Sequence, residues 1–297
     1  MYCMCISDLH IHSNFSDGKL AIPEIVDLYG RKGFGEIAIT DHLCETNTLF
    51  GKAAVYMNRT LTPAVFPIYL EILKTEAKRA WEQYQMVLLP GFELTKSPEI
   101  NHRSARVLGI GISQFLSANA DIVELCRSIR AQGGVAIATE TLWAQRSEIA
   151  GEVDAWEAAA GRKLSEEILE SGLPKVASSG LHSLKHLSSW KTAFFCEKNP
   201  QAILKAIRDQ ELRLFYYDEE KANDLRNVVD VSRLGVRLGT YLSRNHALSG
   251  SFPLEIQSSK IRGPGIASGF DPKAFERRGQ RLKRKSGEFF SVSVPKV

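Results

Sequence analysis

Histidines and acids gather in two short stretches near the start of the chain, "SDLHIHSNFSDG" and "AITDH". Together they hold Asp8, His10, His12, Asp17 and His42. Alternate residues of a strand point to one face, so Asp8, His10 and His12 would lie side by side. Two imidazoles on one face, with acids nearby, favour a metal site over a pair of core histidines, and Asp8 can orient the imidazoles from behind. Asp17 precedes Gly18 in a predicted turn that folds its carboxylate back over the strand end.

Further polar residues follow other apolar runs of the chain. "QMVLLPGFELT", "VAIATE" and "PKVASSGLH" have the pattern of buried strands, and with their flanks they carry Glu93, Glu140 and His182. Helical patterns separate many of the runs, including one over residues 67–85, and such alternation predicts a parallel sheet with right-handed crossovers. In a barrel of this kind the active site lies at the carboxyl ends of the strands, where all of these polar residues fall.

The motifs, taken in their order along the chain, resemble those of the PHP (polymerase and histidinol phosphatase) family. The similar segments are "DLHIHSNFSDG", "AITDH", "GFELT", "GGVAIA", "AWE" and "SSGLH", and the resemblance covers about residues 5–210. It implies an α/β fold, namely a distorted (β/α)7 TIM-like barrel of the PHP type. It also implies phosphoester hydrolysis with one to three divalent metal ions, commonly Zn²⁺, Mn²⁺ or Fe, at the rim of the barrel.

Carried over residue by residue, the resemblance implies two sets of metal ligands. These are His10, His12 and Glu93 for the family's first site, and Asp17, His42 and His182 for its third site. The third set is complete. The first lacks a carboxylate, because Gly180 stands where the family has Asp, and the family's second site loses both of its histidines.

Two residues stand at the positions of those lost histidines. Arg106 replaces one, and the nearest other histidine is His102. A guanidinium cannot ligate a metal, so Arg106 either clamps a phosphate bidentately or forms a salt bridge to Glu93 or Glu140 that replaces a missing cation. Glu140 lies near the second lost position and can serve as an oxygen ligand, which favours a harder metal such as Mn²⁺ or Mg²⁺.

These residues predict a metal-dependent hydrolase that acts on a small phosphorylated substrate through metal-activated water. In this hypothesis Arg106 supplies positive charge to the phosphate, and Asp8 or Glu140 takes the proton. One alternative is a degenerate barrel that holds one metal or none and works as a binding or regulatory protein. Another is nucleic-acid processing aided by the C-terminal tail.

The charge of the chain is concentrated at its C-terminal end. The net charge is +4, whereas residues 251–297 alone contain 10 Lys and Arg against 4 Asp and Glu. We expect a PHP-like barrel over residues 1–222, an additional helix within 223–250, and a Gly/Pro/Ser-rich linker with a basic tail over 251–297. The tail would give weak, salt-dependent contact with nucleic acid. The chain shows neither a signal peptide nor a membrane-length apolar run, so we expect a cytoplasmic protein with no membrane contact.

Overall fold

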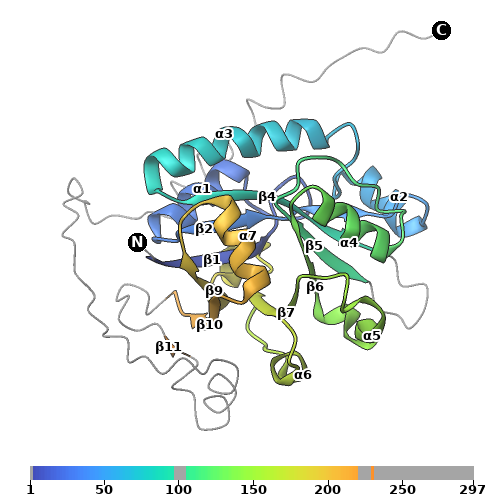
Figure 1. Cartoon of the computed structure of the whole chain (residues 1–297). Coiled ribbons are helices and arrows are strands. Elements are labelled where there is room, and N and C mark those ends of the chain that lie inside the picture. Colours follow the sequence, from blue (N-terminus) through green and yellow to red (C-terminus); the bar gives the residue numbers. More distant parts are fainter. Residues whose placement is uncertain (1–2, 97–104, 220–228, 231–297) are drawn as a thin grey trace, which may run out of the picture. The chain divides into compact units, whose positions relative to one another are not determined.

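The computed structural model describes residues 3–96, 105–219 and 229–230 (Figure 1). These residues belong to one compact unit, Met1–Ala247. The strands are β1 (Cys3–Ile11), β2 (Glu36–Ile39), β3 (His42–Cys44), β4 (Val87–Thr95), β5 (Arg106–Ile110), β6 (Val135–Ala138), β7 (Ala155–Ala160), β8 (Lys175–Ser178), β9 (Ser189–Cys196), β10 (Leu212–Tyr217) and β11 (Val229–Asp230). The α-helices are α1 (Ile22–Arg31), α2 (Leu49–Tyr56), α3 (Phe66–Tyr84), α4 (Ile122–Ala131), α5 (Arg146–Ile149), α6 (Glu166–Glu170) and α7 (Pro200–Asp209), and the 3-10 helices are η1 (Glu140–Gln145) and η2 (Leu184–His186).

The strands form one sheet that nearly closes on itself. Its order is β11-β10-β9-β1-β2-β4-β5-β6-β7-β8, with β3 beside β4. β1, β2 and β4 run parallel to one another, and so do β6, β7 and β8. A bridge between Ile11 and Leu181 joins the end of β1 to the segment after β8. The mixed α/β fold with a barrel-shaped sheet, expected from the sequence, is confirmed.

The expectation of a parallel sheet is wrong at β9, which runs antiparallel to β1 and β10, and at β5, which runs antiparallel to both β4 and β6. The connection from Thr95 to Arg106 is shorter than the dozen or more residues that a parallel crossover needs, so the chain must reverse its direction. The reversal has a consequence for the site. Arg106 begins β5 and pairs with Thr95 at the end of β4, and therefore the first residue of β5 lies at the rim where neighbouring strands end.

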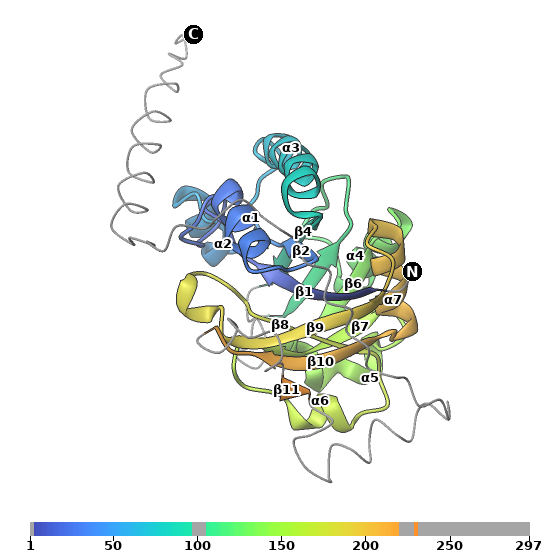
Figure 2. The ribbon, with the colours of Figure 1, turned by 90° about the vertical axis from the view of Figure 1, so that its left-hand side faces the viewer.

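Amphipathic helices cover the sheet where the apolar periodicity predicts them. α1 has Pro23 in its first turn and buries Ile25, Val26 and Tyr29. The helix predicted over residues 67–85 is α3. Figures 1 and 2 show α1 and α3 side by side along one flank of the sheet, where they pack against each other and α3 packs on β4. Packing on this flank supports β4, the strand that carries Glu93.

The C-terminal predictions fall mostly outside the described residues. Of the segment 223–250, the structure describes Val229 and Asp230, which form β11 and pair antiparallel with β10. The remainder of that segment, the tail over 251–297 and His102 lie outside the described residues. The domain boundaries, the contact with nucleic acid and the cytoplasmic location stay predictions. None of the helices in the described part of the chain is long and apolar enough to cross a membrane.

Candidate metal centre

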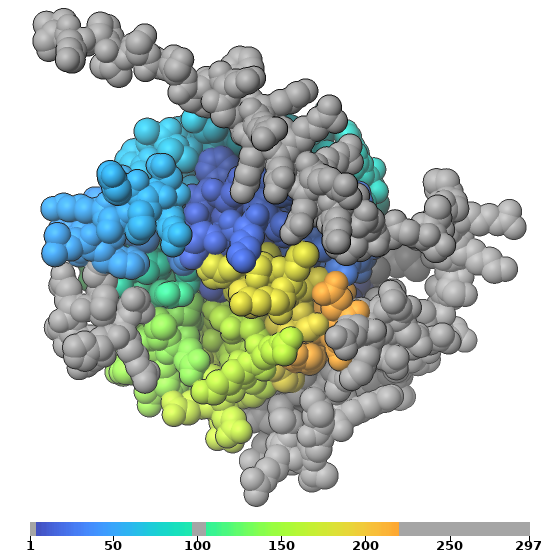
Figure 3. All heavy atoms as spheres, turned by 180° about the vertical axis from the view of Figure 1, so that it is seen from behind, coloured from blue at the N-terminus to red at the C-terminus, as the bar shows by residue number. Residues whose placement is uncertain are grey.

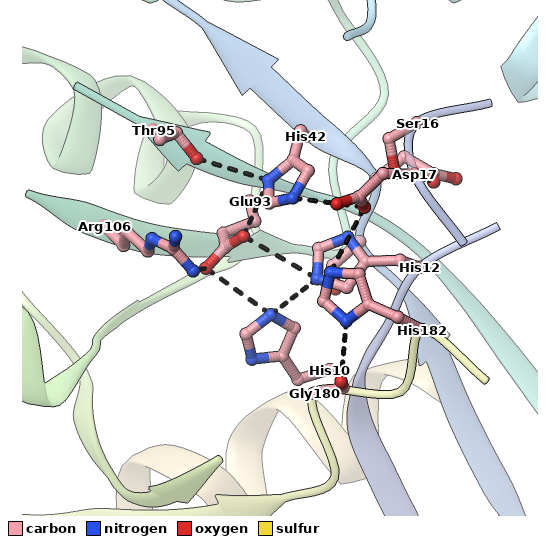
Figure 4. A network of polar contacts seen from close by, with 12 residues as sticks. His10, His12, Ser16, Asp17, His42, Glu93, Thr95, Arg106, Gly180 and His182 are labelled. Atoms are coloured by element: carbon pink, nitrogen blue, oxygen red, sulfur yellow. Dashed lines mark hydrogen bonds and ion pairs between the residues drawn. The ribbon is translucent and has the colours of Figure 1, made fainter. Parts of the chain in front are cut away.

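Four strands bring the predicted ligands together at one end of the sheet (Figure 4). His10 lies on β1 and His12 directly follows it, while His42 begins β3 and pairs in register with Glu93 on β4. The segment after β8 is tied to the end of β1 by two backbone hydrogen bonds. The His12 N–H donates to the Leu181 carbonyl at 2.8 Å, and the Leu181 N–H donates to the His10 carbonyl at 3.1 Å. This tie places His182, the next residue, beside His12.

A tight turn after β1 carries Asp17 into the same cluster. Buried Asp41 holds the turn, because its carboxylate accepts the Ser13 N–H at 2.8 Å and the Ser13 and Ser16 hydroxyls at 2.5 Å each. A side chain at Gly18 would meet the backbone carbonyl oxygen of His12 at 2.2 Å, so the turn requires glycine there. Asp17 is thereby folded back over the strand end.

The turn also meets the segment after β8 on the surface. In Figure 3 the dark blue segment near the start of the chain adjoins the yellow segment around residue 180. The Lys19 N–H donates to the His182 carbonyl at 2.9 Å across this boundary. The two segments that carry Asp17 and His182 are therefore fixed to each other by the backbone.

The first candidate ligand group is His10, His12 and Glu93, all three buried. Their facing atoms are close: His10 Nε2 lies 3.0 Å from His12 Nε2 and 3.5 Å from Glu93 Oε1, and His12 Nε2 lies 3.7 Å from Glu93 Oε2. One ligand atom from each residue falls within 4.8 Å of the others. Two imidazole nitrogens and a carboxylate converging in this way make a set that zinc, manganese and iron accept.

The second candidate group is His12, Asp17, His42 and His182. Asp17 Oδ1 lies 3.3 Å from His42 Nε2 and 3.1 Å from His182 Nε2, and the rings of His12 and His182 stack at 4.1 Å between centroids. The side chains of Asp17 and His182 are 33% and 32% exposed. The two groups thus share His12, and the second group is the one that solvent reaches.

Neighbouring side chains in the cluster shift one another's pKa. Burial disfavours the imidazolium of His10, but Glu157 and Glu93 outweigh burial and raise the pKa of His10 to about 10. Burial lowers the pKa of His12 well below its usual value, and the neighbouring His10 adds to this. Burial would raise the pKa of Glu93, but His10 and His42 hold it well below the usual range. The cluster therefore combines an ionised Glu93 with a neutral His12, while His10 keeps a proton that a bound cation would displace.

One buried nitrogen of the cluster, His12 Nδ1, lacks a hydrogen-bond partner among the described residues, whereas Glu93 Oε2 lies 2.8 Å from His42 Nδ1. A buried polar atom without a partner costs about 1–3 kcal/mol unless something else satisfies it. The converging imidazole nitrogens and carboxylate oxygens are donors that a divalent cation accepts, and hence the residues present fit the metal that the PHP resemblance implies.

Asp8 does not join the cluster. Its carboxylate accepts hydrogen bonds from the Tyr29 hydroxyl at 2.6 Å and the Ser179 N–H at 2.9 Å, and it pairs with Lys191 Nζ at 2.8 Å. The expected role of Asp8 behind the imidazoles is wrong, because the described contacts of its carboxylate are with these three groups. Lys191 lies on β9, which pairs antiparallel with β1 and so delivers a counterion to Asp8.

Arg106 and Glu140 are placed differently from each other. Arg106 Nη1 lies 3.4 Å from Glu93 Oε1, so the salt bridge weighed in the sequence analysis forms with Glu93, and the Arg106 side chain is 39% exposed. Glu140 begins η1 with an exposed side chain and belongs to neither candidate group. Gly180, which stands at the position of the family's Asp, has φ +56°, and its carbonyl accepts from His182 Nδ1 at 2.9 Å.

One residue of the site was missed from the sequence. Glu157 on β7 is buried, and its Oε1 lies 2.9 Å from His10 Nδ1. A signal was available, since Glu157 is the one acid within the otherwise apolar strand "AWEAAA". An acid at a buried strand position needs a partner, and here the partner is the imidazole of His10.

Comparison with known proteins bears on this arrangement of ligands. Residues 8–102, which include five of the six predicted ligands, match the model of the PHP domain family. The resemblance to the PHP family is confirmed. A comparison with curated proteins found no match.

Solved structures similar to this PHP-like chain support the fold. A two-domain protein from Bacteroides vulgatus that contains a predicted PHP-like metal-dependent phosphoesterase has 18% sequence identity and a TM-score of 0.56. The match covers 73% of this chain and 65% of that one, slightly less than two thirds of its length. PsfC from Pseudomonas syringae matches with 14% identity and a TM-score of 0.46, over 81% of this chain and 98% of PsfC. The first match shows a shared fold, and the second is too loose to add to it.

Proposed function

We propose that this chain is a phosphoesterase that uses Zn²⁺, Mn²⁺ or Fe to hydrolyse a small phosphorylated substrate. The observation that carries the proposal is the convergence of four imidazoles and two carboxylates into two overlapping ligand groups that share His12. A divalent cation in such a centre polarises a phosphoryl oxygen and makes water nucleophilic at neutral pH. The other contributions come from the residues of the chain.

The two groups have different tasks in this proposal. His10, His12 and Glu93 are buried and would hold one cation away from solvent. Asp17 and His182 are each about one-third exposed, so the second group would meet the substrate. The donation from His182 Nδ1 to the Gly180 carbonyl supports this role, because a proton on Nδ1 leaves the Nε2 lone pair free for a cation.

Arg106 would bind the phosphate. Its guanidinium touches Glu93 through Nη1 yet stays 39% exposed, so other N–H groups can still reach a substrate oxygen. A fixed positive charge beside the ligands would neutralise the phosphate oxygens as charge builds in the transition state. This places an arginine where the PHP resemblance implies a metal-ligating histidine.

The contacts of Asp8 restrict which residue can accept the proton from the attacking water. Both oxygens of its carboxylate already accept hydrogen bonds or pair with Lys191, which makes Asp8 a poor base. Glu140 is exposed, and no described residue forms an ion pair with it. A role for Glu140 in proton transfer stays a prediction.

The proposal is tested with the purified full chain, loaded in turn with Mn²⁺, Zn²⁺ or Fe²⁺, on a phosphomonoester and a phosphodiester of p-nitrophenol. The variants His42→Ala and His182→Ala should each lose about 100-fold or more in kcat/KM, the loss typical when a group that stabilises transition-state charge is removed. Glu148→Ala, an exposed acid on α5, is the control and should match the parent. Hydrolysis that persists in both histidine variants would refute the proposal.

One observation favours a rival function. The Arg106 guanidinium lies against Glu93, where its charge repels a further cation. A barrel that binds too few metal ions to activate water could bind a phosphorylated ligand without cleaving it. Elemental analysis separates the two readings, because one or more tightly held metal ions per chain supports the phosphoesterase and a metal-free chain that still binds phosphate supports the binding protein.

A further inference from the structure

We infer that Glu157 is a positioning residue of the metal centre, which fixes the imidazole of His10 so that Nε2 faces the cation. The inference rests on the proposal that the centre binds a metal, and it adds a residue that belongs to neither ligand group. The contact that carries it is the 2.9 Å distance between Glu157 Oε1 and His10 Nδ1.

The two nitrogens of the His10 ring have separate partners. Nδ1 meets Glu157, whereas Nε2 lies 3.0 Å from His12 Nε2 and 3.5 Å from Glu93 Oε1. A carboxylate on Nδ1 keeps one ring proton there, and once a cation displaces the proton on Nε2 the lone pair of Nε2 faces that cation. Carboxylates that hold metal-bound histidines in this way also make the imidazole a stronger donor.

The surroundings of Glu157 give it no other evident purpose. Its side chain is 1% exposed and that of His10 is 4% exposed, so water does not screen the pair. Among the described residues, His10 is the one that forms an ion pair with Glu157, and Glu157 Oε2 has no hydrogen-bond partner there. A buried carboxylate is costly, so a position that served packing alone would favour an apolar residue.

β7 also supplies the rigidity that a positioning residue needs. Glu157 lies mid-strand, in register with Val176 on β8, and its strand neighbours Trp156 and Ala158 are both 1% exposed. The backbone that carries the carboxylate is therefore held by buried neighbours on both sides. Glu157 on β7 thus contacts the ring of His10 on β1. The backbone pairing of β1 with β2 and β9 does not orient that ring.

The test measures metal binding instead of catalysis. Mn²⁺ and Zn²⁺ are titrated calorimetrically into the metal-free full chain and into Glu157→Gln, which keeps the shape but not the charge. Loss of such a supporting partner typically weakens metal binding about 10- to 100-fold. Glu166→Gln, an exposed acid on α6, is the matched control and should bind as the parent does.

A spectroscopic measurement distinguishes positioning from a merely structural effect. With ¹⁵N-labelled histidine rings and Zn²⁺ bound, the parent should show His10 protonated at Nδ1, and Glu157→Gln should show a mixture of tautomers. If Glu157→Gln does not fold by circular dichroism, Glu157→Asp replaces it. That variant keeps the charge but has a shorter reach, and weakened binding is again expected.

The outcomes keep this inference apart from the proposed function. Parent-like affinity in the folded Glu157 variant, or a parent chain that binds no metal, would overturn the role of Glu157. A chain whose metal binding weakens in Glu157→Gln but which cleaves no phosphoester would sustain the role of Glu157 and refute the phosphoesterase.

Discussion

The ion pair of Asp8 and Lys191 begins two residues before His10 on β1 and belongs to neither ligand group, so it can be perturbed by itself. Both side chains are fully buried, Nζ lies 2.8 Å from Asp8 Oδ2, and Nζ also donates to the Ser189 hydroxyl at 2.7 Å. Asp8 further accepts from Tyr29 and from the Ser179 N–H. The pair therefore joins β1, β9, α1 and the segment after β8.

Lys191→Met keeps the length and apolar stem of the side chain but leaves the Asp8 carboxylate buried without a counterion. Removing one partner of a buried ion pair costs about 3–5 kcal/mol in the free energy of unfolding. For a domain of this size, that loss lowers Tm by roughly 6–20 °C. The double variant Asp8→Asn/Lys191→Met removes both charges and should be more stable than Lys191→Met alone.

The assay is urea unfolding of the metal-free chain at pH 7, followed by circular dichroism. Lys205→Met is the matched control, because Lys205 forms an exposed pair with Asp209 on α7 and should change stability by less than about 1 kcal/mol. A free energy of unfolding of Lys191→Met within about 1 kcal/mol of the parent would show that the ion pair does not stabilise the fold as expected. So would a double variant whose destabilisation equals the sum of the two single ones.

Three further perturbations follow from the same contacts. Burial raises the pKa of Glu36 to about 8 from 4.5. The protonated form therefore stabilises the fold fully below pH 4.5, and this contribution is lost as the pH rises through 8. Urea unfolding at pH 5 and 8.5 should show that Glu36→Gln abolishes about 3–5 kcal/mol of this pH dependence. Arg106→Ala should lower kcat/KM about 10- to 100-fold, the worth of a charge-assisted hydrogen bond, without weakening metal binding in calorimetry, and weakened binding would contradict its role. Asp41→Asn should loosen the turn that holds Asp17, costing about 1–3 kcal/mol of stability and weakening metal binding, whereas unchanged binding would show that the turn is held otherwise.

The sequence predicted those parts of the fold that depend on local patterns. The apolar periodicity of α1 and α3 and the apolar runs of β1 and β4 lie where expected, because each depends on neighbouring residues. The direction of β5 was wrong, since a short apolar run is the same in either direction and the short connection before Arg106 decides it. β9 was not predicted, and within it Lys191 is buried only because Asp8 is its partner.

The candidate site shows the same division. The motifs brought forward His10, His12, Asp17, His42, Glu93 and His182, and these residues do lie together. The parts that pattern could not provide are pairings between distant segments. Asp8 pairs with Lys191, Glu140 lies outside both ligand groups, and Glu157 contacts Nδ1 of His10. Such pairings follow from the closure of the sheet and not from spacing along the chain.

Hydrolysis of a phosphoester by the chain before and after metal loading decides whether the bound metal makes this chain a phosphoesterase. The full chain is stripped with a chelator, dialysed, and titrated with Mn²⁺ or Zn²⁺ while bound metal and p-nitrophenol release are measured together. We expect no release from the stripped chain, and a rate that rises with metal occupancy of the centre formed by His12, Asp17, His42 and His182. A rate that ignores occupancy, or a fully loaded chain that releases nothing from any phosphoester tested, would contradict it.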